Sequence, residues 1–134
     1  MTMNLTFLLS RILNEEDRNV NSERGNYCDK NDTSSQSIDW QGKGWYRIMD
    51  PAGTKIPEGR VTSQKCGTFS TGWLNGTHPN QLGEQIEGQV CFDIGIPDDG
   101  ICRYEKSIQI INCGAYYLYS LPDVSICESR YCTV

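Results

Sequence analysis

Seven cysteines in a chain of 134 residues are the feature that most constrains how this sequence can fold. Six of them lie between Cys66 and Cys132, and no two have the C-x-x-C spacing of a zinc knuckle or a redox motif. Tetrahedral zinc sites need four close sulfur or nitrogen ligands, usually delivered as two short-spaced pairs, and this chain has a single histidine. Cysteines separated by ten residues, as Cys91, Cys102 and Cys113 are, favour cross-strand disulfides over metal ligands or reduced thiols. The odd number leaves at least one thiol over, and disulfides indicate a compartment outside the cytosol.

Three Asn-x-Ser/Thr sequons, at Asn4, Asn31 and Asn75, also favour a secreted glycoprotein. The Asn75 sequon is the best candidate, because Asn75-Gly76 predicts a type I′ turn that would hold the acceptor on an exposed loop tip. Residues 1–10 lack the basic region and the uninterrupted apolar core of a signal peptide. Either the chain is a fragment of a larger secreted protein or its assigned start is wrong, and we favour the fragment.

The composition predicts one loop-rich domain over residues 1–134 with a thin core. The hydrophobic fraction is 37%, the mean hydropathy is −0.52 and the chain has thirteen glycines. A net charge of −5 without a basic stripe makes nucleic acid an unexpected partner. The longest apolar stretch, around Leu5–Leu13, is far too short to span a bilayer. We expect the isolated domain to be a monomer.

The order of patterns along the chain predicts a mainly β fold. In residues 1–25, apolar residues at helical spacing predict a short terminal helix or strand, and residues 26–44 form a polar loop. Residues 45–134 form the β core, in which alternating apolar runs predict strands near 45–49, 89–92, 105–111 and 115–121. The last two runs are expected to pair as a hairpin or as adjacent strands. Short strands with turns at regular spacing indicate a small, disulfide-stapled antiparallel β sandwich-like domain with long loops.

No motif in the sequence supports catalysis, so we do not expect an enzyme. His78 has no hydrolase or metalloprotease motif around it and is expected to make a structural hydrogen bond. A calcium ion could be held by Asp93 together with Asp98-Asp99-Gly100, although acidic turns are usually only solvated. We therefore expect neither a metal ion nor a cofactor.

Five aromatic residues provide an alternative function, a lectin-like surface on which sugars stack. They are Trp45, Trp73, Tyr116, Tyr117 and Tyr119. In a small β domain, aromatic residues at alternating positions more often divide between the core and the sheet surface. Carbohydrate binding, with or without calcium, is kept as the alternative to a non-catalytic interaction module.

A series of short motifs resembles the eight-cysteine domain of uromodulin and its relatives. In order, the motifs are Gly44-Trp-Tyr-Arg47, Ala52-Gly-Thr-Lys-Ile-Pro57, Cys66-Gly-Thr68, Gly72-Trp-Leu-Asn-Gly-Thr-His-Pro79, Val90-Cys91, Asn112-Cys113-Gly114, Tyr116-Tyr-Leu-Tyr-Ser-Leu121 and Arg130-Tyr-Cys132. The likeness covers about residues 7–132, which is essentially the whole chain.

The resemblance implies a pairing of the cysteines. Family pairing carried onto this chain gives Cys28–Cys127, Cys66–Cys132 and Cys91–Cys102. Two family cysteines that bond to each other fall where this chain has Arg60 and Ile101, so both halves of one disulfide are missing together. The family partner of Cys113 falls at Phe7, and Cys113 is therefore expected to be a free thiol.

The resemblance also implies a function. Such modules are extracellular, have no known catalysis, and sit beside other extracellular domains in secreted or membrane-anchored glycoproteins. Some relatives present a glycan to bacterial lectins from the segment that matches Tyr117–Val124, but here that segment carries no sequon. We expect a non-catalytic module that mediates or spaces interactions with an extracellular protein or glycan whose identity the sequence does not give.

Overall fold

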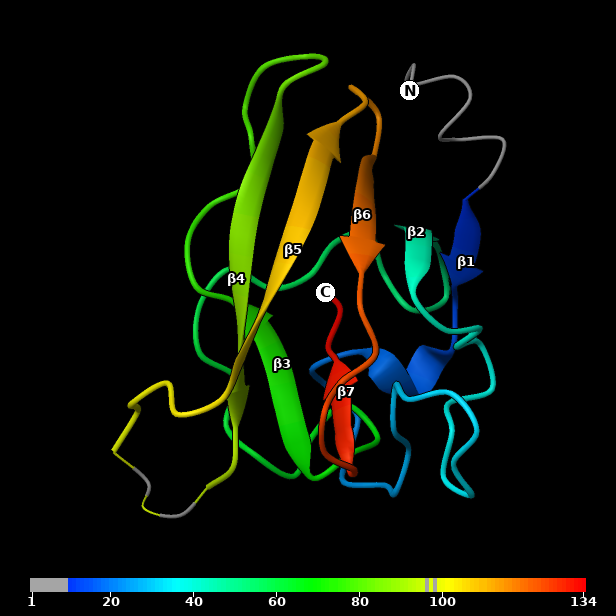
Figure 1. The fold of residues 1–134 in the computed structure, drawn as a ribbon, viewed down its shortest axis with the longest axis vertical. Helices are drawn as coiled ribbons and strands as arrows, with labels where there is room; N and C mark the ends of the chain where they lie inside the picture. The colour runs from blue at the N-terminus through cyan, green and yellow to red at the C-terminus, as the bar shows by residue number, and fades with distance from the viewer. Residues whose placement is uncertain (1–9, 96, 98) are drawn as a thin grey trace.

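Seven strands form one curled sheet in the computed structural model, which describes residues 10–95, 97 and 99–134 (Figure 1). The strands are β1 (Arg11–Leu13), β2 (Gly44–Ile48), β3 (Ser70–Leu74), β4 (Gln85–Asp93), β5 (Glu105–Asn112), β6 (Tyr117–Leu121) and β7 (Ser129–Tyr131). Their order across the sheet is β1-β2-β6-β5-β4-β3-β7. Neighbours pair antiparallel except at the two edges, where β1 pairs parallel to β2 and β7 pairs parallel to β3.

The hairpin predicted from two alternating runs is present as β5 and β6. Asn112 is paired with Tyr117 and Gln109 with Ser120, and the connection turns at Gly114 with φ of 84°. A positive φ suits glycine because it has no Cβ to clash with the backbone. The strand predicted at 89–92 is longer than expected, because residues from Gln85 onward pair with β5.

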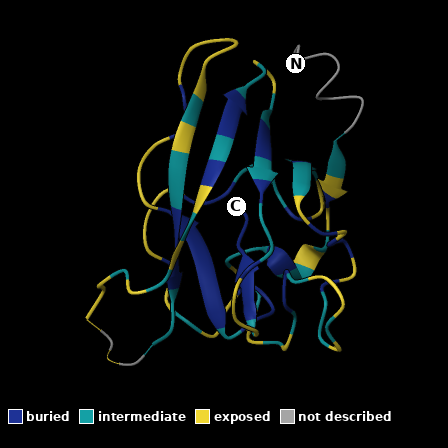
Figure 2. Cartoon of the chain, viewed as in Figure 1, coloured by how far each residue is buried: buried dark blue, intermediate teal, exposed yellow. Residues whose placement is uncertain are grey.

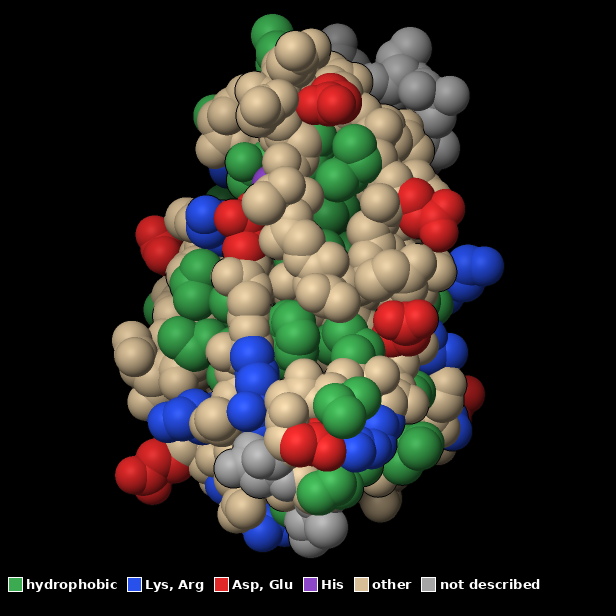
Figure 3. Space-filling model, turned by 90° about the vertical axis from the view of Figure 1, so that its left-hand side faces the viewer, with side chains coloured by type: hydrophobic (Ala, Val, Ile, Leu, Met, Phe, Trp, Pro, Cys, Tyr) green, Lys and Arg blue, Asp and Glu red, His purple; other side chains and the backbone are tan. Residues whose placement is uncertain are grey.

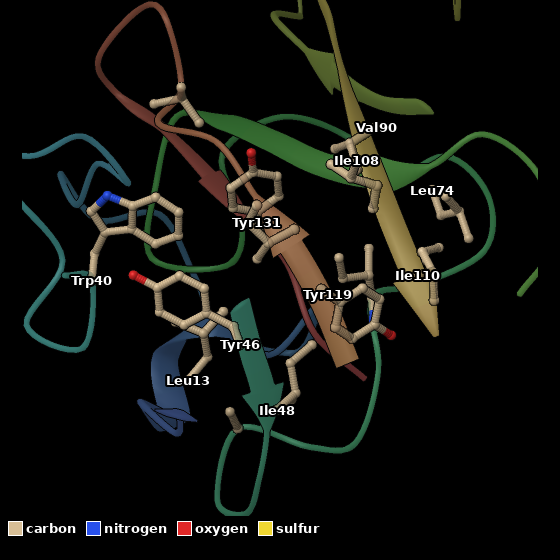
Figure 4. Close-up of a cluster of buried hydrophobic side chains, with 14 of the residues drawn as sticks. Leu13, Trp40, Tyr46, Ile48, Leu74, Val90, Ile108, Ile110, Tyr119 and Tyr131 are labelled. Atoms are coloured by element: carbon tan, nitrogen blue, oxygen red, sulfur yellow. The ribbon is translucent and has the colours of Figure 1, made fainter. Parts of the chain in front are cut away.

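The core lies on the inner face of the curled sheet, where buried side chains contributed by the strands pack against one another (Figure 4). Tyr46 of β2, Ile110 of β5 and Tyr119 of β6 are fully buried. Trp40, from the segment predicted to be a polar loop, also enters this core and stacks on Tyr46 with ring centroids 4.8 Å apart. The loop over residues 26–44 is therefore anchored to the core by one large aromatic side chain. The prediction of a polar loop did not include this contact.

The strands β3 and β7 are buried along their whole length (Figure 2). The outer edge of β7 is covered because the Asp29 N–H donates to the Ser129 carbonyl oxygen at 2.9 Å. Just beyond the strand, the Thr133 N–H donates to the Arg18 carbonyl oxygen at 3.0 Å. The N-terminal segment thus wraps against the last strand and satisfies backbone groups that an edge strand would leave open.

The N-terminal segment contains a strand, β1, followed by a single 3-10 turn, η1 (Glu16–Arg18). The apolar residues that suggested a helix before residue 10 lie outside the described residues. The mainly β fold is confirmed, and no helix in the described part of the chain is long and apolar enough to cross a membrane.

The type I′ turn predicted at Asn75-Gly76 is wrong. Such a turn needs positive φ at both central residues, whereas the non-glycine residues with positive φ in the described part of the chain are Asp32, Gln64 and Cys66. The chain does not reverse at Asn75, because ten residues separate β3 from β4 and carry His78 inward to bond with Glu58.

Candidate functional site

Three disulfides cross-link the chain, two of them between positions 99 and 66 residues apart and one between positions 11 apart. The pairs and their Cα–Cα separations are Cys28–Cys127 at 5.4 Å, Cys66–Cys132 at 5.5 Å and Cys91–Cys102 at 5.6 Å. These are the same pairs that the family resemblance implies. The first two hold the segments on either side of β7 against the N-terminal half, and the third ties β4 to the loop that precedes β5.

Cys113 follows β5 and has no disulfide partner among the described residues. It is half-buried, and burial raises the pKa of its thiol above the ordinary value. A raised pKa keeps the sulfur protonated at neutral pH, which makes it a poor nucleophile. The Phe7 position, where the resemblance puts the missing partner, lies outside the described residues.

The Asn75 sequon is well placed to carry a glycan. Asn75, Gly76 and Thr77 are all exposed, and the Asn75 backbone N–H donates to the Gln89 carbonyl oxygen at 2.8 Å. The backbone of the sequon is thus fixed to the sheet while its side chains face solvent.

The Asn31 sequon is exposed but more engaged with the protein. The Asn31 side chain lies beside Gly42. A Cβ atom placed on that glycine would be 3.5 Å from the side-chain amide nitrogen of Asn31. The Thr33 hydroxyl donates to the Lys30 carbonyl oxygen at 3.0 Å. The third sequon, at Asn4, lies outside the described residues.

His78 is the centre of a closed hydrogen-bonded network. Its Nδ1 lies 2.6 Å from Glu58 Oε2, and its Nε2 lies 2.7 Å from the Tyr119 hydroxyl oxygen. Because a carboxylate can only accept, Nδ1 carries the proton, and Nε2 accepts from the Tyr119 hydroxyl. The Tyr119 oxygen in turn accepts from the Ile56 N–H at 3.1 Å. Every ring nitrogen is therefore used within the protein.

Burial lowers the pKa of His78 below its ordinary value, although the Glu58 carboxylate acts in the opposite direction. The hydrogen bonds from His78 lower the pKa of Glu58. Burial also raises the pKa of Tyr119 far above its ordinary value, so its hydroxyl is not a nucleophile at neutral pH. The cluster ties the loop that carries His78 to β6 and has the features of a structural site.

A second polar cluster, centred on Arg18, was not anticipated from the sequence. Arg18 and Asp29 are fully buried, and Asp39 is nearly so. The guanidinium of Arg18 contacts both carboxylates, with Nη2 at 2.7 Å from Asp29 and 2.6 Å from Asp39. Burial disfavours the charge on Arg18, but the two carboxylates outweigh burial and raise its pKa. The same contacts lower the pKa of Asp39 despite its burial.

Arg130 of β7 is also fully buried but is less well satisfied. Its Nη1 donates to Asp17 at 2.8 Å and to the Cys66 carbonyl oxygen at 3.1 Å. Its Cζ lies 4.9 Å from the centroid of the Tyr27 ring. Within the described part of the chain, Nε and Nη2 have no hydrogen-bond partner. Burial, followed by repulsion from Arg18, lowers the pKa of Arg130.

The aromatic residues proposed as a sugar platform do not form one surface. Trp73 and Tyr119 are buried, whereas Trp45, Tyr116 and Tyr117 are half-buried. The Tyr117 ring packs on the imidazole of His78, with ring centroids 4.4 Å apart.

The described carboxylates that were considered as calcium ligands form ion pairs with arginines. Asp93 accepts from Arg60 Nε at 2.7 Å, and Asp99 accepts from both terminal nitrogens of Arg103 at 2.6 and 2.7 Å. Asp98 is not described. Each described carboxylate thus already has a cation beside it, which disfavours a shared calcium site.

Charged side chains on the face seen in Figure 3 are mixed in sign, with Lys and Arg interspersed among Asp and Glu. A nucleic-acid interface would instead concentrate basic groups along one stripe. The expectation that this chain does not bind nucleic acid stays a prediction.

Comparison with known proteins identifies the family. The model of the uromodulin-like domain family matches residues 46–133. Over 109 residues the chain is 33% identical to pancreatic secretory granule membrane major glycoprotein GP2 of Rattus norvegicus, an alignment that covers 78% of this chain and 20% of that protein. Over 91 residues it is 33% identical to uromodulin of Mus musculus, covering 67% of this chain and 14% of that protein. The chain spans about a fifth or less of the length of these relatives. With most of its length matched, the chain belongs to the uromodulin-like domain family.

Proposed function

We propose that this chain is a non-catalytic, glycosylated extracellular module that mediates or spaces interactions of a larger secreted or membrane-anchored protein. The observation that carries the proposal is the set of three disulfides, because such bonds persist in extracellular proteins and are rare in the cytosol. One relative is by name a secretory granule membrane glycoprotein, which is in keeping with such a setting.

The absence of an enzymatic role is part of the proposal. The best candidate for chemistry, His78, has both ring nitrogens engaged inside the protein, and its neighbour Tyr119 is buried. A general base needs a lone pair within reach of a substrate proton. The isolated module is proposed to be a monomer, with Asn75 as its principal glycan acceptor.

The test is peptide mass mapping, without reduction, of protein secreted from eukaryotic cells, with and without glycosidase. We expect the three disulfides, a Cys113 thiol without a partner in residues 10–134, and a glycan on Asn75. Thr77→Ala should remove that glycan, and Thr77→Ser should retain it because the sequon is preserved. Seven free thiols without any glycan would overturn the extracellular assignment.

A further inference from the structure

A polar pocket lies beside the Cys28–Cys127 disulfide, just before the start of β7. Its volume is about 540 Å³, within the range of pockets that hold small ligands. Three separate stretches of chain line it, and the residues are Asn26, Tyr27, Ser34, Ser35 and Glu128. Because Tyr27 and Glu128 are sequence neighbours of the two bonded cysteines, the disulfide holds two of the lining stretches together.

Tyr27 supplies the aromatic wall, and its ring is backed by a buried cation. The Arg130 guanidinium lies over this ring, with Cζ at 4.9 Å from the ring centroid, and Arg130 is fully buried. The backbone of Tyr27 is fixed as well, since its N–H donates to the Gly67 carbonyl oxygen at 3.0 Å. Its carbonyl oxygen accepts from the Thr68 hydroxyl at 2.8 Å. The ring is therefore held in place before any ligand arrives.

The other lining side chains are available for a ligand. Within the described part of the chain, the side chains of Asn26, Ser34, Ser35 and Glu128 make no hydrogen bond to protein. Together they offer an amide, two hydroxyls and a carboxylate, which can both donate to and accept from a polyol. An aromatic face beside such groups suits a ring with one apolar face and several hydroxyls.

The charges around the pocket select against ionic ligands. Glu128 would repel an anion, and the Arg130 charge behind the Tyr27 ring would oppose a cation stacked on that ring. We propose that this pocket binds a neutral pyranose sugar, stacked on Tyr27 and hydrogen-bonded to the amide, hydroxyl and carboxylate groups of the surrounding loops.

This site differs from the aromatic set considered in the sequence, and none of those aromatic residues lines it. It goes beyond the proposed function, because a pure spacer would carry no such ligand. For a ligand of about a dozen non-hydrogen atoms, a dissociation constant on the order of 1 mM is expected.

The experiment is a titration of the isotope-labelled, disulfide-bonded chain, followed by amide NMR shifts. The neutral probes are methyl β-glucopyranoside, methyl β-galactopyranoside and N-acetylglucosamine, and the charged probe is N-acetylneuraminic acid. We expect saturable shifts, for at least one neutral sugar, at the amides of residues 26–27, 34–35 and 128. The charged sugar should bind more weakly.

Variants separate the pocket from general effects on folding. Asn26→Ala and Ser34→Ala change exposed side chains and should weaken binding about tenfold without altering the rest of the spectrum. Glu128→Gln should reduce the discrimination against the charged sugar. Gln109→Ala, in a separate cavity of about 250 Å³ on the sheet, is the matched control and should leave binding unchanged.

Three outcomes would overturn the proposal. One is the absence of saturable shifts with all three neutral sugars at about 50 mM, well above the expected dissociation constant. Another is a shift pattern centred on other residues, and the third is binding that survives both alanine variants. If the disulfide map is intact in the same sample, a failed titration rejects the pocket and leaves the extracellular module standing.

Discussion

Replacing Arg18 by lysine tests whether the geometry of the buried guanidinium, and not its charge alone, stabilises the fold. Arg18 Nε and Nη2 bond to Asp39, Nη1 and Nη2 bond to Asp29, and Nη1 also donates to the Tyr131 carbonyl oxygen at 3.0 Å. All five N–H groups of the guanidinium are used. Lysine keeps the charge but offers three donors from one nitrogen.

The magnitude follows from the count of lost bonds. Lysine leaves at least two acceptors short, and a hydrogen bond to a charged group contributes about 1.5–3 kcal/mol. We expect Arg18→Lys to lower the free energy of unfolding by about 3 kcal/mol or somewhat more. Arg18→Met should lower the free energy of unfolding by about 3–5 kcal/mol, because it leaves Asp29 and Asp39 buried without the cation that contacts them. A loss of about 3 kcal/mol corresponds to a fall in Tm of roughly 12 °C for a domain of this size.

The assay is urea unfolding of the oxidised protein, followed by tryptophan fluorescence, with Trp40 as a buried reporter. The matched control is Arg103→Lys, since Arg103 binds Asp99 through the same two-pronged geometry at the surface. This control should leave the urea midpoint unchanged, because exposed ion pairs contribute little. If Arg18→Lys costs less than about 1 kcal/mol with an unchanged m-value, the argument from donor geometry is refuted.

Three further predictions concern the disulfides, pH and the free thiol. Replacing both Cys91 and Cys102 by alanine opens a loop whose ends are 11 positions apart. In the chain-entropy model this change should lower the free energy of unfolding, measured in urea, by about 3 kcal/mol. An unchanged urea midpoint would contradict this prediction. As pH falls below about 6.5, the unfolded chain takes up a proton at His78 that the folded chain resists, and Glu58 adds to the loss of stability at lower pH. The urea midpoint should therefore fall between pH 7 and pH 4, and a flat profile would count against the network of His78 and Glu58. Cys113→Ser should change the free energy of unfolding by less than about 0.5 kcal/mol and leave the elution volume in size-exclusion chromatography that of a monomer.

The sequence predicted those parts of the fold whose signal is local. The strands β2, β5 and β6 were found because apolar residues alternate along them and face one core. β7 was missed because it has three residues, and its central residue is the charged Arg130. Its strand conformation comes from pairing with β3, and no pattern within its own residues indicates this pairing.

The buried charges could not be predicted for a similar reason. Arg18 is separated from its two carboxylate partners by 11 and 21 positions in irregular chain, so no helical or strand spacing joins them. Each residue, taken alone, resembles a solvated surface charge. Trp40 is different, because a lone tryptophan within a polar stretch is itself a signal that the stretch is anchored to the core.

The disulfides and the Arg18 cluster act on the same two stretches of chain. Cys28 and Asp29 are adjacent, as are Tyr131 and Cys132, so each stretch is held both covalently and by the buried guanidinium. A polar segment without regular structure would otherwise have to offset its ordering entropy with the packing of Trp40 and a few backbone hydrogen bonds.

The pocket beside Tyr27 is built on this doubly held segment and is therefore formed before a ligand binds. A sugar that binds only the folded pocket must then stabilise the domain, by about 1.4 kcal/mol at ten times its dissociation constant. Opening the Cys28–Cys127 bond should weaken binding and stability together, since the same ordered loop supports both.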